Sequence, residues 1–286
     1  MIRTKNKIIT ILVLIVLLLI TTGFRLFATE TGVKSPHIES IAEVENTNLG
    51  GVMASMPDNS AKILFESLLG MKLNSYHAFD TVDETVNALK GNEIQIAWFS
   101  DVTARYLLNT VSGLRALNTT DPTNHQLDFA LALRTDETEL RDQLNTVLAI
   151  LKENGTLQEL IDTYVDTTDY SYSYPESKMK STSIYKSAKP IYIGVSGAVP
   201  PLDLIDVSGE PTGFSVALMD EIGLLLRREV KFVVMKNEAM FSNLMSGKVD
   251  AIFCYGTTKS TMVTDKKYIM TDGYYTMNQY TYLVQE

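Results

Sequence analysis

The sequence predicts an α/β fold with mostly parallel sheets, because short apolar runs alternate with helical patterns over most of the chain. The clearest alternation lies in residues 190–286. Apolar runs at 191–195, 230–235 and 249–255 have the length of buried strands and are bounded by turn residues. Between them, apolar residues recur at helical spacing over 214–226, and a shorter helix is expected over 239–245, ended by Gly247.

The first half of the chain repeats this alternation. Strands are expected over 52–55, 74–79, 94–99 and 127–133, and helices over 83–90, over 139–152, over 157–165, and starting near residues 57–60 and 104. The helix at 139–152 carries one apolar stripe: Leu140, Leu144, Val147, Leu148 and Leu151. Such a stripe needs a covering layer, which the sequence must supply from elsewhere.

The order of motifs in residues 190–286 resembles the first lobe of the family 3 extracellular solute-binding proteins, which have the type II periplasmic-binding-protein fold. The motifs are a strand, Pro200-Pro201, Gly209, Gly213-Phe214 before a helix, the tetrapeptide at 247–250 before a strand, and Thr-Asp-Gly-Tyr-Tyr at 271–275. The resemblance implies a two-lobed α/β protein with a ligand cleft between the lobes.

Residues 38–165 resemble the second lobe and closing tail of the same family, most strongly over 128–165. The family has the lobes in the opposite order. Two explanations are open: a circular permutation, in which both regions form one cleft, or a truncation, in which a further second lobe followed Glu286. The uncovered apolar stripe at 139–152 favours one cleft. Between the regions, residues 166–189 are rich in Ser, Thr, Tyr and Lys, which predicts a surface linker.

Residues 1–28 read as a membrane anchor or signal. Arg3, Lys5 and Lys7 precede an uncharged run at 8–24, whose helical length is roughly 25 Å, close to the thickness of a membrane core. The basic flank predicts that the rest of the chain is exported. The length of the run favours an uncleaved membrane helix over the alternative, a cleaved signal peptide.

Composition excludes several function classes. The formal net charge of −9 argues against a nucleic-acid partner. Cys254 is the only cysteine, so no internal disulfide is possible, and the three histidines are scattered without the spacing of metal ligands. No glycine-rich phosphate loop is present. We therefore expect no metal, no cofactor and no enzyme activity.

Ligands of open α/β sheets bind beyond the carboxyl ends of the strands. The resemblance therefore places two loops of the 190–286 region at the cleft: one with Pro201 and Leu202, and one with Tyr255, Gly256, Thr257, Thr258 and Lys259. Family members usually carry an aromatic ring near Leu202 and an arginine within residues 260–263, and both are replaced here. Lys259 is the nearest cation, and two roles stay open for it: ligand contact and solvated surface lysine.

In the 38–165 region, Asn59 and Ser60 lie at an expected helix N-terminus, where an anion can bind. Ser100 and Asp101 end a strand near the place where the family has an acid that meets the ligand ammonium group. Tyr274 precedes the strand that crosses between lobes, and it either lines the cleft or packs beneath it.

The sequence thus predicts a membrane-tethered, extracytoplasmic protein that closes on a small polar ligand, amino-acid-like or an amine, and delivers it to a transporter or signals to a sensor output domain. Two alternatives remain: a binding-protein-like module that serves protein interaction without a small ligand, and a lyase on the same fold.

Overall fold

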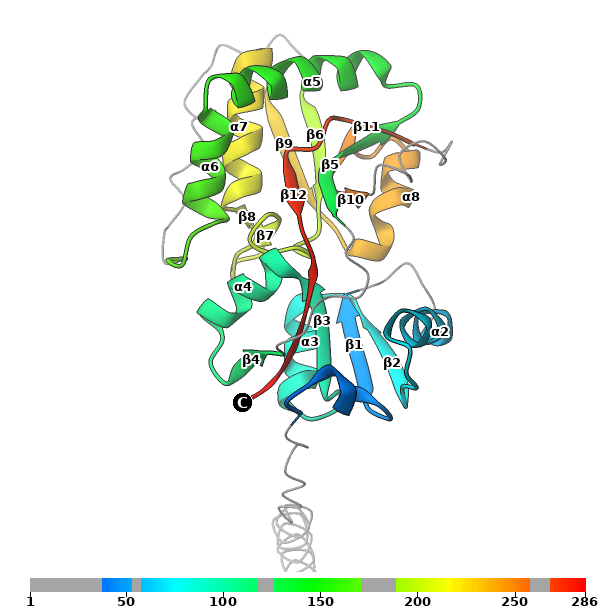
Figure 1. Cartoon of the computed structure of the whole chain (residues 1–286). Helices are drawn as coiled ribbons and strands as arrows, with labels where there is room; N and C mark the ends of the chain where they lie inside the picture. Colours follow the sequence, from blue (N-terminus) through cyan, green and yellow to red (C-terminus); the bar gives the residue numbers. More distant parts are fainter. Residues whose placement is uncertain (1–37, 53–57, 118–125, 171–188, 258–267) are drawn as a thin grey trace, which may run out of the picture. The chain divides into compact units, whose positions relative to one another are not determined.

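The computed structural model describes residues 38–52, 58–117, 126–170, 189–257 and 268–286. The expected membrane run at 8–24, and the predicted ligand residues Thr258 and Lys259, lie outside these ranges. Among the helices that the structure describes, none combines the length and the hydropathy needed to cross a membrane. Residues 36–286 form one compact unit that contains two main sheets (Figure 1).

The first sheet has the strand order β2-β1-β3-β13-β4. Its strands are β1 (Asn48–Val52), β2 (Ser75–Phe79), β3 (Ile96–Ser100), β4 (Leu114–Ala116) and β13 (Tyr280–Gln285). Strand β1 pairs in parallel with β2 and β3, whereas β13 pairs antiparallel with β3 and β4. The last strand of the chain therefore completes a sheet that the first strands begin.

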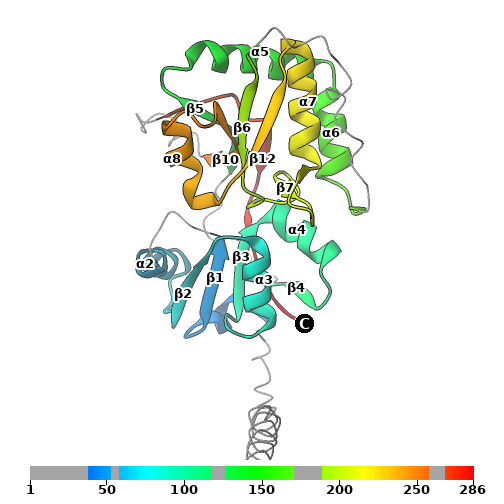
Figure 2. The same cartoon turned by 180° about the vertical axis from the view of Figure 1, so that it is seen from behind.

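Helices cover both faces of the first sheet, and together they form what we call the first-sheet lobe. They are α2 (Asp58–Leu69), α3 (Val82–Lys90) and α4 (Asp101–Thr110), with a short 3-10 helix, η1 (Ile41–Val44), before β1. Helix α3 begins at a capping box, in which Thr81 and Glu84 bond each other's backbone N–H. Figure 2 shows α3 in front of the sheet. Alternate β13 residues reach both cores, Tyr282 on the Phe65 face and Leu283 on the Phe99 face.

The second sheet has the order β11-β5-β10-β6-β9, with β12 also paired to β5. Its strands are β5 (Leu127–Arg134), β6 (Ile191–Val195), β9 (Val230–Val234), β10 (Ala251–Thr257), β11 (Tyr268–Met270) and β12 (Tyr275–Met277). Strands β6, β9 and β10 are parallel, and the pairs made by β5 are antiparallel. A small hairpin, β7 (Leu204–Ile205) with β8 (Pro211–Thr212), follows β6.

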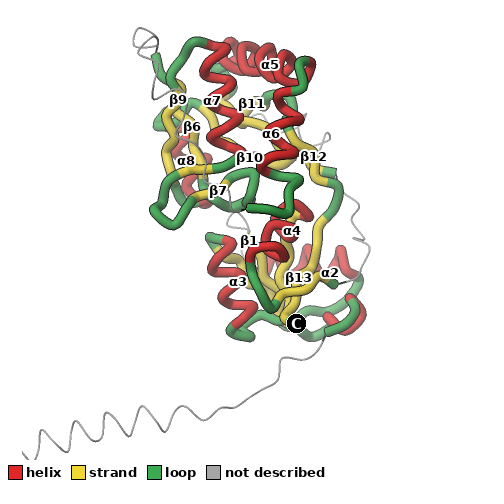
Figure 3. Tube along the Cα trace, turned by 90° about the vertical axis from the view of Figure 1, so that its left-hand side faces the viewer, coloured by secondary structure: helices red, strands yellow, loops and turns green. Residues whose placement is uncertain are grey.

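Four helices pack on the second sheet, and with it they form the second-sheet lobe. They are α5 (Thr138–Glu153), α6 (Thr156–Tyr164), α7 (Phe214–Leu226) and α8 (Met240–Met245), the last preceded by a 3-10 turn, η4 (Asn237–Ala239). Figure 3 shows α6 and α7 side by side with α5 above them. The apolar stripe of α5 is buried in the same core as Phe214 and Leu218 of α7, so the 190–286 region supplies the cover that the sequence required.

The predicted α/β class is confirmed, but the sheets are mixed rather than mostly parallel. Every antiparallel pair in the two main sheets involves β5 or β13. Strand β5 comes from the first half of the chain and lies in the sheet built mainly by the second half. Strand β13 comes from the second half and lies in the sheet built mainly by the first half. Helix and strand positions agree with the sequence patterns to within a few residues, whereas β4, β11, β12 and the β7–β8 hairpin are too short to show a periodic pattern.

Candidate functional site

The best candidate for a ligand site is a cavity of about 210 Å³ lined by residues of both sheets. The first-sheet lobe and β13 supply Val52, Trp98, Phe99, Ser100, Thr103 and Tyr280, and the second-sheet lobe supplies Leu127, Phe129, Ala198 and Val199. A larger cavity, of about 470 Å³, is lined by α5, α6 and the β12 region of the second-sheet lobe. A solute there touches one lobe only, so it cannot draw two lobes together.

Aromatic rings form much of the wall on the first-sheet side. Trp98 of β3 stacks on Tyr280 of β13, with ring centroids 4.0 Å apart, and its other neighbour Phe65 meets it edge-on at 4.9 Å. Trp98 and Ser100 are two residues apart on one strand, so their side chains share a face of the sheet. Tyr280 pairs with Ser100 in the ladder, which brings the tyrosine to the same end of the sheet.

Ser100 and Thr103 bring two hydroxyl groups to the residues that line this cavity, in addition to the polar groups of Trp98 and Tyr280. Ser100 is the N-cap of α4: its Oγ accepts the Thr103 N–H at 3.3 Å and donates to Thr103 Oγ1 at 2.9 Å. Thr103 is only 2% exposed. Because its hydroxyl oxygen accepts the bond from Ser100, the Thr103 O–H remains a donor for a ligand acceptor.

On the second-sheet side, Gly256 allows the wall to lie close to β10. Gly256 pairs with Phe129, and a Cβ at this position would meet Phe129 at 3.1 Å and Leu127 at 3.5 Å. Both of those side chains line the cavity. Gly256 therefore lies beneath the wall, and Ser100 is the one residue lining the cavity among those predicted ligand residues whose side chains the structure describes.

Other predicted ligand residues lie elsewhere. Leu202 is fully buried in the main core of the second-sheet lobe, and the neighbouring Pro201 is also buried; neither is among the residues that line the cavity. Tyr274 is 3% exposed: it packs beneath the site, and its hydroxyl accepts the Cys254 N–H at 2.9 Å. Asn59 and Ser60 are exposed in the first turn of α2. The side chains of Tyr255 and Thr257 lie outside what the structure describes.

Asp101 directly follows Ser100, which lines the cavity, but Asp101 itself does not line it. It is the first residue of α4, and burial raises the pKa of its carboxyl group, partly offset by the backbone N–H groups of Asn278 and Val102. Its Oδ1 has no hydrogen-bond partner. The charges closest to it are Arg105 and Asp166, so Asp101 belongs to the contacts where the lobes meet rather than to the cavity wall.

Arg105 links the two lobes through a small polar network. Its Nη2 donates to Asp166 Oδ1 and to the Tyr275 hydroxyl, each at 2.9 Å. Arg105 is on α4, whereas Asp166 follows α6 and Tyr275 begins β12. A second ion pair between lobes joins Lys236 and Asp80 at 3.4 Å. Sequence reasoning did not find Arg105, because a lone surface arginine on a helix carries no pattern.

Asp203 organises the loop that carries Ala198 and Val199 to the cavity. It is 1% exposed, and its Oδ2 accepts bonds from Ser196 N–H, the Ser196 hydroxyl and Gly197 N–H. Its Oδ1 has no partner. Burial, opposed by these bonds, raises the pKa of Asp203 to about 6.

The raised pKa predicts a pH-dependent stability. The folded state holds the Asp203 proton more tightly than the unfolded chain does. The stabilisation of the folded state by protonated Asp203 is therefore fully present below pH 4 and is lost as pH rises through about 6. A difference of about two pKa units corresponds to up to about 3 kcal/mol. In Asp203→Asn this loss should disappear, as measured by urea unfolding between pH 4 and 7. Asp206→Asn, in the exposed hairpin turn, is the control and should keep it. Equal profiles for the parent protein and Asp203→Asn would contradict the assignment.

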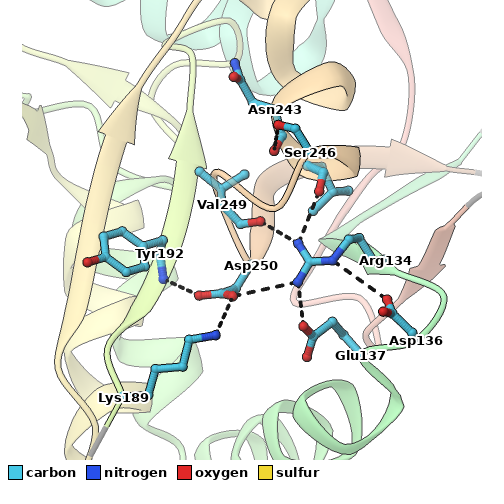
Figure 4. Close-up of polar contacts among 10 residues, drawn as sticks. Arg134, Asp136, Glu137, Lys189, Tyr192, Asn243, Ser246, Val249 and Asp250 are labelled. Atoms are coloured by element: carbon cyan, nitrogen blue, oxygen red, sulfur yellow. Dashed lines mark hydrogen bonds and ion pairs between the residues drawn. The ribbon is translucent and has the colours of Figure 1, made fainter.

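Asp250, by contrast, belongs to a polar network inside the second-sheet lobe. Figure 4 shows Arg134 donating to the carbonyl oxygen of Val249 and pairing with Glu137. Arg134 also donates to the carbonyl oxygen of Leu244 at 3.1 Å. Asp250 Oδ2 accepts the Tyr192 N–H at 2.9 Å, and its Oδ1 lies 3.8 Å from Arg134 Nη2. This network ties β5, β6, α8 and β10 together at the end of the sheet opposite to the cavity-lining residues of β5.

Comparison with known proteins confirms the resemblance for part of the chain. Residues 191–286 match the bacterial extracellular solute-binding proteins, family 3. None of the curated proteins compared with the chain matches it.

Solved structures similar to the chain include three amino-acid-binding proteins. One is an arginine transport system periplasmic binding protein from Legionella pneumophila, with 12% identity, a TM-score of 0.42, and 84% of this chain and 86% of that chain covered. Another is an arginine-bound ArgBP mutant from T. maritima, with 12% identity, a TM-score of 0.42, and 86% and 92% covered. The third is the ancestral amino acid-binding protein AncCDT-1, a precursor of cyclohexadienyl dehydratase, with 11% identity, a TM-score of 0.45, and 86% and 84% covered.

Proposed function

We propose that this chain is an extracytoplasmic solute-binding protein that holds a small molecule between its two lobes. The observation that carries the proposal is the cavity whose wall comes from both sheets. A solute in this cavity contacts both lobes, and it loses half of those contacts when the lobes separate. Binding therefore stabilises the closed arrangement by differential contact, which is the physical requirement for ligand-driven closure.

The direct polar contacts between lobes are weak enough to allow such motion. Arg105 and Asp166 have side chains 46% and 38% exposed, and Lys236 and Asp80 have side chains 69% and 35% exposed. Exposed ion pairs typically contribute at most about 1 kcal/mol. These ion pairs add little to the closed arrangement, which is also held by Val102 of α4, fully buried in the core of the second-sheet lobe, and a solute that bridges the lobes adds to these contacts.

The match to an extracellular family supports placement outside the cytoplasm. The basic residues before the apolar run at 8–24 support a tether to the membrane in that orientation. A tethered binder serves either a transporter or a sensor output domain, and these are the partner classes we propose. The exchange of β5 and β13 between sheets supports a permuted order of the family's two lobes.

The test is a thermal-shift screen of the full chain in detergent with amino acids, amines, peptides and neutral aromatic compounds. At least one class should raise Tm by several degrees when present at about 100 times Kd, which corresponds to about 2.7 kcal/mol. Ala198→Phe fills the cavity and should abolish the shift. Ala149→Phe, at an exposed position of α5, is the matched control and should keep it. If no class shifts Tm, the protein is not a small-solute binder and the interaction-module alternative stands.

A further inference from the structure

We infer that the solute is a small, uncharged molecule with a single aromatic ring and a hydrogen-bond acceptor, rather than a free amino acid. This inference rests on the proposed function, since it assigns a ligand class to the cavity lined by both sheets. Three properties of the described cavity wall carry it: the volume of the cavity, its aromatic content and its lack of charge.

The volume limits the solute to about one ring. Typical sites for drug-sized ligands measure about 300 to 1,000 Å³, whereas an apolar cavity of about 150 Å³ holds a benzene molecule. The cavity here has about 210 Å³. It therefore accommodates a benzene ring with one small substituent.

The wall offers flat apolar surfaces to such a ring. Four of the residues that line it are aromatic: Trp98, Phe99, Phe129 and Tyr280. Aromatic pairs gain about 0.5 to 1.5 kcal/mol beyond the burial of their area when they stack offset or meet edge-on. Phe129 comes from β5 and Trp98 from β3, so a bound ring contacts aromatic groups of both lobes at once. A flexible aliphatic solute is stabilised by burial of its apolar surface but not by ring stacking.

Charge is what separates this solute from an amino acid. No charged side chain lines the cavity among the residues that the structure describes. The two carboxyl groups nearest in sequence to the wall do not line the cavity: the half-buried Asp101 lies beside Arg105, and the buried Asp203 accepts bonds within its own loop, with one oxygen of each left without a hydrogen-bond partner. A zwitterion placed here leaves its ammonium and carboxylate groups without opposite charges, and burying an unpaired ion costs several kcal/mol.

The pair formed by Ser100 and Thr103 suits one neutral acceptor. Ser100 and Thr103 bond each other, and the Thr103 O–H is left to donate. An amide, aldehyde or hydroxyl oxygen on the ring accepts that bond. A charged carboxylate needs more donors than this pair supplies, because each of its oxygens accepts about two bonds.

Trp98 makes the test direct, because it is the only tryptophan of the chain. Its intrinsic fluorescence is titrated in the full chain with benzamide, phenol, toluene, benzoate, benzylamine, phenylalanine and arginine. Benzamide or phenol should change Trp98 emission and raise Tm, with a Kd at least tenfold lower than those of benzoate, benzylamine and the amino acids.

A threonine-to-valine pair isolates the hydrogen bond. Thr103→Val should weaken benzamide and phenol binding about tenfold and leave toluene binding unchanged. Thr146→Val, on the exposed face of α5, is the matched control and should change neither. Thermal unfolding of both variants verifies that they fold, and Ser100→Ala provides a second variant if Thr103→Val does not.

The outcomes separate this inference from the proposed function. Tighter binding of an amino acid, benzoate or benzylamine overturns the inference and leaves the solute-binding function standing; a benzoate preference would implicate a cation such as Lys259. Binding of any solute without a change in Trp98 emission also overturns it, because the site then lies elsewhere. If none of these compounds binds, and the broader screen finds no ligand either, both proposals fail.

Discussion

Leu144→Ala is expected to destabilise the protein by about 3 to 5 kcal/mol. Leu144 is fully buried in the core where α5 meets α6 and α7, and a leucine truncated there loses its burial and leaves a cavity. The loss of stability reports on packing between the two halves of the chain, because α5 lies in the 38–165 region and α7 in the 190–286 region. Urea unfolding followed by circular dichroism measures it.

Ile150→Ala on the same helix is the matched control. Ile150 is 42% exposed, so its truncation should cost less than about 1 kcal/mol. A Leu144 variant as stable as the Ile150 variant would mean that α5 is not covered by α7. The packing of the two halves into one unit would then be wrong.

Arg134→Met should cost about 3 to 5 kcal/mol, because it leaves Asp250 and two carbonyl oxygens without their cation (Figure 4). The Asp250 side chain is 7% exposed, and the Lys189 amino group at 3.5 Å, on a side chain 73% exposed, compensates it only in part. Methionine retains most of the arginine's apolar stem, so lost packing contributes little to the difference.

A double-mutant cycle separates the ion pair from the other bonds of Arg134. Asp250→Asn in the Arg134→Met background should recover part of the lost stability, because the amide is cheaper to bury than an unpaired carboxylate. Arg141→Met is the control: Arg141 pairs with Asp142, whose side chain is 67% exposed, and its loss should cost less than about 1 kcal/mol. Equal costs for Arg134→Met and Arg141→Met would show that the buried network contributes no more than a surface pair.

Much of the fold was predictable from the sequence, because long elements carry periodic patterns. The stripe of α5 and the apolar run of β6 each indicated their element to within about a residue. The mixed pairing was not predictable, because strand direction depends on which segments meet in space. Residues 280–285 read as the start of a crossing strand, and nothing local indicates that they insert between β3 and β4.

The site was less predictable than the fold. Ser100 was predicted as a ligand residue from its place at a strand end; it lines the cavity, and its contact with a ligand stays a prediction. Trp98 lies within the expected strand 94–99, where an apolar run indicates a core position, and it does pack on Phe65, yet it also lines the cavity and stacks on Tyr280. Side chains at the edge of a core serve both roles, and a pattern of apolar residues cannot separate them. Leu202 was predicted to face the cleft and Tyr274 was a candidate for it, but both are buried, because a position near a loop does not indicate whether a side chain is exposed.

The placement of β13 has a consequence for how the molecule is made. A ribosome delivers β1, β2, β3 and β4 long before it delivers residues 280–285, which separate β3 from β4 in the finished sheet. Throughout synthesis, the edge of β3 is therefore exposed to other nascent chains, with its backbone groups unpaired. Completion of the first-made lobe must wait for the last-made strand, and any factor that shields that edge until then would raise the yield of folded protein.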